Sequence, residues 1–145
     1  MKRTILFIIL IIVVAGGIYA WREYSRKNPD LKQAKADYSV QAETLIKEFE
    51  TDKAASDKKY IGKNIEVSGN IKKVDAETNP VVFFLGSEDE MSSVQCSMDS
   101  THASDYTKLQ KGTSVTLKGV VNGAESDELL GTDVKLNRCV VVNNQ

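Results

Sequence analysis

The chain begins with an uninterrupted apolar segment. Residues 5–21 are seventeen residues without a charged side chain, and Tyr19, Trp21 and Tyr24 gather at its C-terminal end. At about 1.5 Å per residue a helix of this length spans roughly 26 Å, close to the thickness of a bilayer core. Aromatic rings favour the headgroup region. The pattern therefore predicts one transmembrane helix over residues 5–21, which follows a short tail at residues 1–4 and contacts the lipid bilayer.

The same segment has a second interpretation, as a cleaved signal peptide. Lys2 and Arg3 precede it, but Ile18-Tyr19-Ala20 matches a small-x-small cleavage site poorly, so we favour an uncleaved anchor. Lys2 and Arg3 favour a cytoplasmic N-terminus and a C-terminal domain outside the cytoplasm. The cations that follow the segment favour the reverse orientation, which stays open; they are Arg22, Arg26, Lys27, Lys32 and Lys35.

Residues 22–60 change from a polar to a helical pattern. Residues 22–38 are polar, carry a breaker at Asn28-Pro29-Asp30, and predict a stalk. Residues 39–60 predict a helical segment that packs on the following domain, with Asp52 as the cap of a second short helix. The first helix places apolar residues at the spacing of a single face: Ala42, Leu45, Ile46 and Phe49.

From residue 61 the pattern alternates between apolar and polar, which is typical of β-strands. Strands are expected over residues 65–71, 81–85, 94–98, 115–121 and 134–141, with a short helix between residues 99 and 111. A slip in phase at Asn137-Arg138 indicates a bulge. The order of three strands, a helix and two strands predicts a mainly β fold, a five-stranded oligonucleotide/oligosaccharide-binding (OB) type barrel over residues 61–145. Gly69 and Gly119 would let the long strands coil. Another small barrel or a two-sheet sandwich is the alternative.

Several short motifs resemble a known family in the order in which they occur. They are Phe49-Glu50, residues 59–63 leading into residues 65–69, residues 94–98, Lys111-Gly112, and residues 136–139. From Ala42 to Cys139 the chain resembles the tRNA-anticodon-like OB family of small bacterial proteins with an N-terminal membrane anchor. The resemblance implies an OB domain behind a hydrophobic segment, usually outside the cytoplasm. The family is named for its similarity in fold to tRNA-binding modules, which does not establish that this chain binds tRNA.

Charge is divided unequally along the chain. Residues 61–145 contain 8 Lys and Arg against 12 Asp and Glu, a net charge of −4. Proteins that bind nucleic acid gain most of their affinity from cations on phosphates, so this balance disfavours nucleic acid without excluding it.

Two cysteines lie on the predicted third and fifth strands, which are neighbours in an OB barrel. Cys96 and Cys139 are therefore expected to form a disulfide, with two buried reduced thiols as the alternative. A zinc site is not expected, because the nearest further ligand is the distant His102, which we interpret as a surface residue. No motif indicates a cofactor.

A weak candidate binding face lies on the predicted barrel. Alternation sends Phe83 and Phe84 to opposite faces, so one of them is expected outside, where it could stack on a base or sugar with Lys72, Lys73 and Lys118 nearby. The acidic stretches at residues 88–90 and 125–128 are interpreted as solvated turns, with a cation site between them as the alternative.

No acid–base pair or nucleophile arrangement indicates catalysis. The sequence therefore favours a membrane-anchored, non-enzymatic OB-fold binding or interaction module of the bacterial envelope, with a protein or glycan partner. A module that binds single-stranded nucleic acid or tRNA is the alternative, and an enzyme of unknown class is a remote one.

Overall fold

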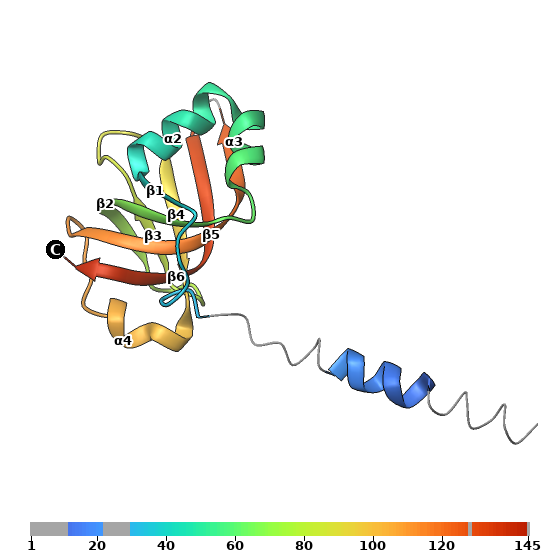
Figure 1. The fold of residues 1–145 in the computed structure, drawn as a ribbon. Coiled ribbons are helices and arrows are strands. Elements are labelled where there is room, and N and C mark those ends of the chain that lie inside the picture. Colours follow the sequence, from blue (N-terminus) through green and yellow to red (C-terminus); the bar gives the residue numbers. More distant parts are fainter. Residues whose placement is uncertain (1–11, 22–29, 128, 145) are drawn as a thin grey trace, which may run out of the picture.

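The computed structural model describes residues 12–21, 30–127 and 129–144, and its centre is a five-stranded barrel (Figure 1). Around the barrel the strands follow the order β2-β3-β4-β6-β5, and β5 returns to pair with β2. The β4–β6 pairing is parallel, and the other barrel pairings are antiparallel. This topology confirms the predicted OB-type barrel. The strands are β2 (Asn64–Asp75), β3 (Val82–Leu85), β4 (Ser93–Met98), β5 (Ser114–Asp127) and β6 (Gly131–Asn144).

Helices cover both ends of the barrel. Helix α2 (Ala42–Thr51) buries the predicted apolar face over one end, and α3 (Lys53–Tyr60) follows it. Asp52 caps α3 as expected, because its Oδ1 accepts a hydrogen bond from the amide of Ala55 at 2.9 Å. The opposite end carries the 3₁₀ helix η1 (Ser100–His102) and α4 (Ala103–Tyr106). There the Tyr106 ring packs edge-on against the Phe83 ring, with 5.9 Å between the two ring centroids.

The segment before α2 differs from the expected stalk and helix. Residues 30–37 lie against the barrel, with Leu31 only 5% exposed, and β1 (Tyr38–Gln41) pairs in parallel with β2. Backbone bonds anchor this segment: the amide of Asp37 donates to the carbonyl of Asn64 at 2.7 Å. A strand of four largely exposed residues has no apolar alternation, so the sequence pattern does not reveal it. Residues 22–29 of the expected stalk lie outside the described residues.

The last two strands are longer than expected. The fourth and fifth strands were expected over residues 115–121 and 134–141, yet β5 continues to Asp127 and pairs with β6 from Gly131 onward. This extension is polar and is supported by backbone pairing and an ion pair of 2.6 Å between Lys135 and Glu125. The expected bulge is confirmed, because Arg138 has a φ of 56° and the pairing register of β6 shifts around it.

The apolar N-terminal segment is described only in part. Residues 12–21 form a helix with exposed side chains, and residues 5–11 of the expected transmembrane helix lie outside the described residues. Within the described ranges, no helix combines the length and the apolar character needed to cross a membrane.

Gly69 and Gly119 have a packing role that the expected strand coiling does not explain. A Cβ at Gly69 would lie 3.0 Å from the Cβ of Ala42 in α2. A Cβ at Gly119 would lie 2.5 Å from Cys139 Sγ and 3.2 Å from the carbonyl oxygen of Asn137. Both glycines therefore allow close approach of a neighbouring element.

We expect Gly119→Ala to destabilise the domain by about 2 kcal/mol, because β5 and β6 would have to separate around the new methyl group. Chemical denaturation measures this change. In a double-mutant cycle with Cys139→Ala, the double mutant should lose less stability than the sum of the losses in the two single mutants, because the sulfur that clashes with the new methyl group is gone. Strict additivity would show that the close contact with Sγ does not limit the packing.

Candidate binding surface of the OB barrel

The register of the strands brings four side chains into one row on the outer surface of the barrel. Lys73 lies opposite Phe84, Phe84 opposite Gln95, and Gln95 opposite Lys135. Directly paired residues share one face of a sheet, and none of these four is buried. The Lys73 Nζ lies 5.2 Å from the centroid of the Phe84 ring. We call these four residues the Phe84 row.

Charges along and beside the Phe84 row are largely paired. Lys135 Nζ lies 2.6 Å from Glu125 Oε1, and Gln95 donates from Nε2 to Asp133 Oδ2 at 2.7 Å. Ser93 donates from its hydroxyl to the other carboxylate oxygen of Asp133. The surface therefore combines one aromatic ring with polar groups of both signs, and cations do not dominate it.

Of the two adjacent phenylalanines, only Phe84 faces outward. Phe83 is buried in the core against Tyr106, whereas Phe84 is half-buried on the outer surface. The alternation along β3 explains this division.

The three lysines grouped with these phenylalanines occupy different environments. Lys118 is only 6% exposed. Its Nζ lies 3.1 Å from Glu66 Oε1 and donates a hydrogen bond to the carbonyl oxygen of Ala34 at 3.0 Å. It holds residues 30–37 on the barrel and lies beneath them. Lys72 donates to the backbone carbonyls of the β3–β4 loop at Glu90, Met91 and Ser92. Lys73 is the lysine of this group that lies in the Phe84 row.

Gln95 and Lys135 complete the row and were not among the expected site residues. Each stands between two buried residues of its strand: Val94 and Cys96, then Val134 and Leu136. Alternation alone would have placed both outside. Their alignment with Phe84 follows from the pairing register of β3, β4 and β6, which cannot be deduced from the sequence. A cleft beside the row is lined by Asn79, Pro80, Ser97, Asp99, Asn137 and Arg138.

The two cysteines are free buried thiols, so the expected disulfide is not formed. Their strands are neighbours as expected, but Cys96 pairs with Leu136, and Cys139 pairs with Met98 beyond the bulge. Burial raises the pKa of the Cys139 thiol well above its ordinary value, and the adjacent Cys96 thiol raises it further. The Cys139 thiol therefore stays protonated, and a protonated thiol is a poor nucleophile in disulfide formation.

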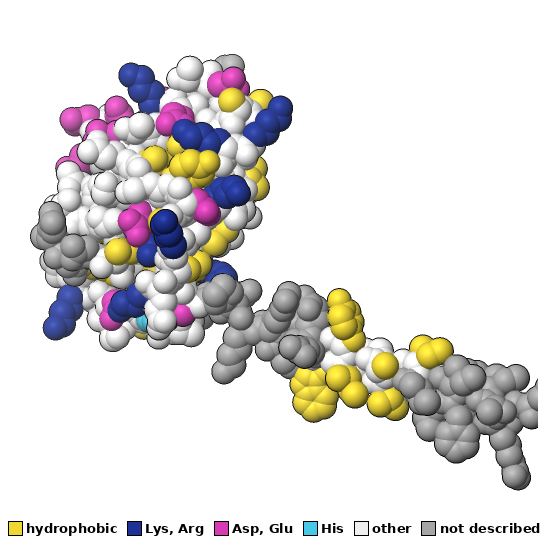
Figure 2. Space-filling model, viewed as in Figure 1, with side chains coloured by type: hydrophobic (Ala, Val, Ile, Leu, Met, Phe, Trp, Pro, Cys, Tyr) yellow, Lys and Arg dark blue, Asp and Glu magenta, His cyan; other side chains and the backbone are white. Residues whose placement is uncertain are grey.

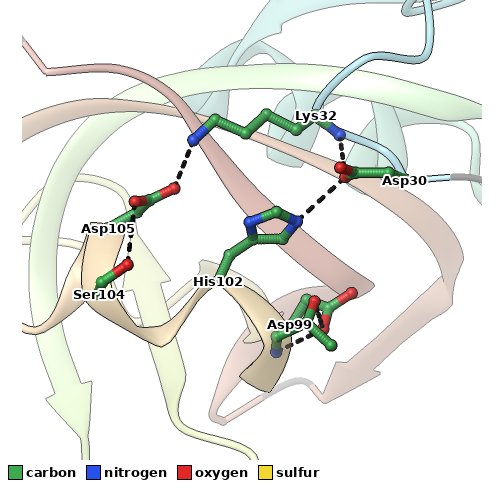
Figure 3. Close-up of polar contacts among 7 residues, drawn as sticks. Asp30, Lys32, Asp99, His102, Ser104 and Asp105 are labelled. Carbon is green, nitrogen blue, oxygen red and sulfur yellow. Dashed lines mark hydrogen bonds and ion pairs between the residues drawn. The ribbon is translucent and has the colours of Figure 1, made fainter.

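His102 is less exposed than expected, because it contacts the N-terminal segment. Figure 3 shows Asp30 and Lys32 reaching the short helices: Asp30 Oδ1 lies 3.1 Å from His102 Nε2, and Lys32 Nζ lies 2.6 Å from Asp105 Oδ2. The backbone amide of Lys32 lowers the pKa of Asp30, and the Lys32 ammonium lowers the pKa of Asp105. These contacts fasten residues 30–32 to the domain.

In the part of the chain that the structure describes, no three His, Cys, Asp or Glu side chains are placed to hold a metal ion.

The family model for tRNA_anti-like proteins matches residues 1–135. The chain belongs to the tRNA_anti-like family. This membership confirms the resemblance found in the sequence motifs, and it agrees with the OB topology of the barrel. No curated protein matches this tRNA_anti-like chain significantly.

Solved structures show a similar fold. A candidate nucleic acid-binding lipoprotein from Klebsiella pneumoniae matches with a TM-score of 0.54 and 18% identity, over 71% of this chain and 91% of that one. An aspartyl-tRNA synthetase from Entamoeba histolytica matches with a TM-score of 0.46 and 15% identity, over 77% of this chain and 26% of the synthetase. An asparaginyl-tRNA synthetase from Pyrococcus horikoshii matches with a TM-score of 0.39 and 15% identity, over 60% and 21% of the two chains. Likeness at these identities concerns the fold alone.

We expect the native tRNA_anti-like protein to resist iodoacetamide at pH 8, because both thiols are buried and the pKa of Cys139 is raised. After denaturation without a reductant, mass spectrometry should find both cysteines alkylated. A denatured, unreduced protein that takes up no label would establish a disulfide and contradict the free thiols of the structure.

Proposed function

We propose that the protein is a membrane-anchored, non-enzymatic binding module that presents the Phe84 row to a protein or glycan partner in the bacterial envelope. The observation that carries the proposal is the Phe84 row itself: an outward aromatic ring among charges that are already paired. An OB barrel uses this part of its surface to bind extended ligands.

The anchoring part of the proposal is supported by the N-terminal segment. The helix at residues 12–21 exposes large apolar side chains, among them Trp21, Ile12 and Ile18. Such a surface is stable in lipid, where a helix satisfies every backbone group internally. Lys2 and Arg3 ahead of it favour a cytoplasmic N-terminus, with the OB domain outside the cytoplasm.

The open surface of the barrel supports the binding part. Helices cover the two ends, and residues 30–41 cover the outside of β2 near Lys118. The outer surface of β3, β4 and the neighbouring part of β6 is left accessible around Phe84. Since Lys135 and Asp133 already have partners there, a ligand that needs many unpaired cations fits this surface poorly. A polypeptide segment or a sugar that stacks on the ring fits it better.

Single-stranded nucleic acid is the second candidate, and one observation favours it. The Lys73 ammonium next to the Phe84 ring is an arrangement that supports base stacking and a phosphate contact together. The family name and the described role of the Klebsiella pneumoniae lipoprotein point the same way. The net charge of −4 over residues 61–145 argues against this candidate.

Protease accessibility tests the anchoring. We expect a C-terminal tag on the full-length protein to be digested in intact spheroplasts, because the proposed orientation places the OB domain outside the cytoplasm. A cytoplasmic protein serves as the control for lysis. Digestion only after lysis would place the domain inside the cell and overturn the envelope assignment.

Ligand class is tested with full-length protein in nanodiscs and fluorescein-labelled oligo(dT) and oligo(U). We expect no saturable change in anisotropy at low salt, because the surface charges are paired. A photo-crosslinker at Gln95 should instead capture a protein or a glycan in cells, and Phe84→Ala or Lys73→Gln should reduce this capture several-fold.

Lys58→Gln, on the exposed side of α3, is the matched control and should leave capture unchanged. Salt-sensitive oligonucleotide binding that Phe84→Ala and Lys73→Gln abolish, and Lys58→Gln retains, would replace the proposed partner with nucleic acid.

A further inference from the structure

Two loops far apart in the sequence meet at one end of the domain. The backbone amide of Thr132, just after the β5–β6 turn, donates to Ser92 Oγ in the β3–β4 loop at 3.0 Å. A Cβ at Gly131 would lie 2.8 Å from the backbone nitrogen of Ser92. The loops therefore touch directly, at the end of the barrel near the C-terminus of α2 and opposite α4 (Figure 1).

This end of the domain exposes three large apolar side chains. Met91, Leu129 and Leu130 are 70%, 83% and 67% exposed. Met91 precedes Ser92, and Leu130 precedes Gly131, so the three lie on both sides of the contact between the loops. We call them the loop-tip patch. Clustered apolar groups in water are unfavourable, and such clusters commonly mark interaction sites.

Hydrogen bonds hold both loops in the shape that exposes the patch. Ser92 donates from its hydroxyl to Glu50 Oε1 at 2.7 Å, and Lys72 binds three carbonyls of the β3–β4 loop. In the other loop, Asp127 Oδ1 accepts from the amides of Leu129 and Leu130 at 2.8 and 3.0 Å. The apolar side chains are thus presented on a fixed framework, which lowers the entropy lost on binding.

The two loops that carry the patch are acidic in sequence. Ion pairs engage Glu88 with Lys111 and Glu125 with Lys135, but carboxylates outnumber cations on these two loops. Figure 2 shows acidic side chains at this end of the domain, with Lys or Arg side chains among them. Among the residues that the structure describes, the carboxylates nearest in sequence to the patch are those of Asp89, Glu90 and Asp127.

We propose that the loop-tip patch docks a cationic, apolar segment of a partner protein. The three apolar side chains would pack against apolar side chains of the partner, while Lys or Arg side chains of the partner form ion pairs with the carboxylates of the two loops. The acidic loops repel an anionic lipid surface. They also repel the same patch on a second copy of this chain. The patch is separate from the Phe84 row, so this proposal stands independently of the function proposed above.

A photo-crosslinker in place of Leu129, in the full-length protein in cells, tests the proposal. The crosslinked peptide of the partner, identified by mass spectrometry, should contain several Lys or Arg next to apolar residues. Crosslinking should fall roughly tenfold in Asp89→Asn/Glu90→Gln and in Leu130→Ser, because charge pairing and apolar contact both contribute to the affinity.

Two matched controls make the outcome specific. A crosslinker at Ile61, which is also exposed but lies elsewhere, should not capture this peptide, and Glu77→Gln should leave the Leu129 crosslink unchanged. Crosslinks to a second copy, to lipid or to an acidic peptide would overturn the proposal. So would a signal at Leu129 no higher than at Ile61, whatever the Phe84 row is found to bind.

Discussion

The parallel pairing of β4 with β6 is the interaction on which the rest of the structure depends, because it closes the barrel. It requires β6 to serve two neighbours at once, β4 on one side and β5 on the other. The bulge at Arg138 lets β6 turn between them, and Gly119 lets β5 approach Cys139 closely enough for the core to fill. Without this closure, α2 and α4 would have no barrel ends to cover, and Gln95 and Lys135 would not lie side by side.

Features built on apolar periodicity could be predicted from the sequence. Ile65 and Val67 in β2, Val94 and Cys96 in β4, and the buried face of α2 all repeat at the period of their element. The capping role of Asp52 followed from local chemistry in the same way. By contrast, β1 and the outer part of the β5–β6 hairpin are held by backbone hydrogen bonds among polar residues. Such bonds leave no periodic signal.

The candidate site was predictable only in part, because a side chain's role depends on what packs over it. Lys118 and Lys73 look alike in the sequence, yet one lies under residues 30–37 and the other beside an outward ring. Sequence alternation separates Phe83 from Phe84, but only the strand register aligns Phe84 with Gln95. The two loops of the loop-tip patch meet through Ser92 and Thr132, a contact between residues forty positions apart that no local pattern reveals.

The fastening of residues 30–32 to α4 has a consequence for the reach of the domain. Because Leu31 is buried and Lys32 is paired with Asp105, the contacts that belong to the domain begin at Asp30 and not at the start of β1. Only residues 22–29 separate Asp30 from the apolar helix, and eight residues extend to about 29 Å at most. For a chain anchored as proposed, this small maximum separation would confine the barrel to a thin layer next to the bilayer. Any partner would then have to come to the membrane to be bound.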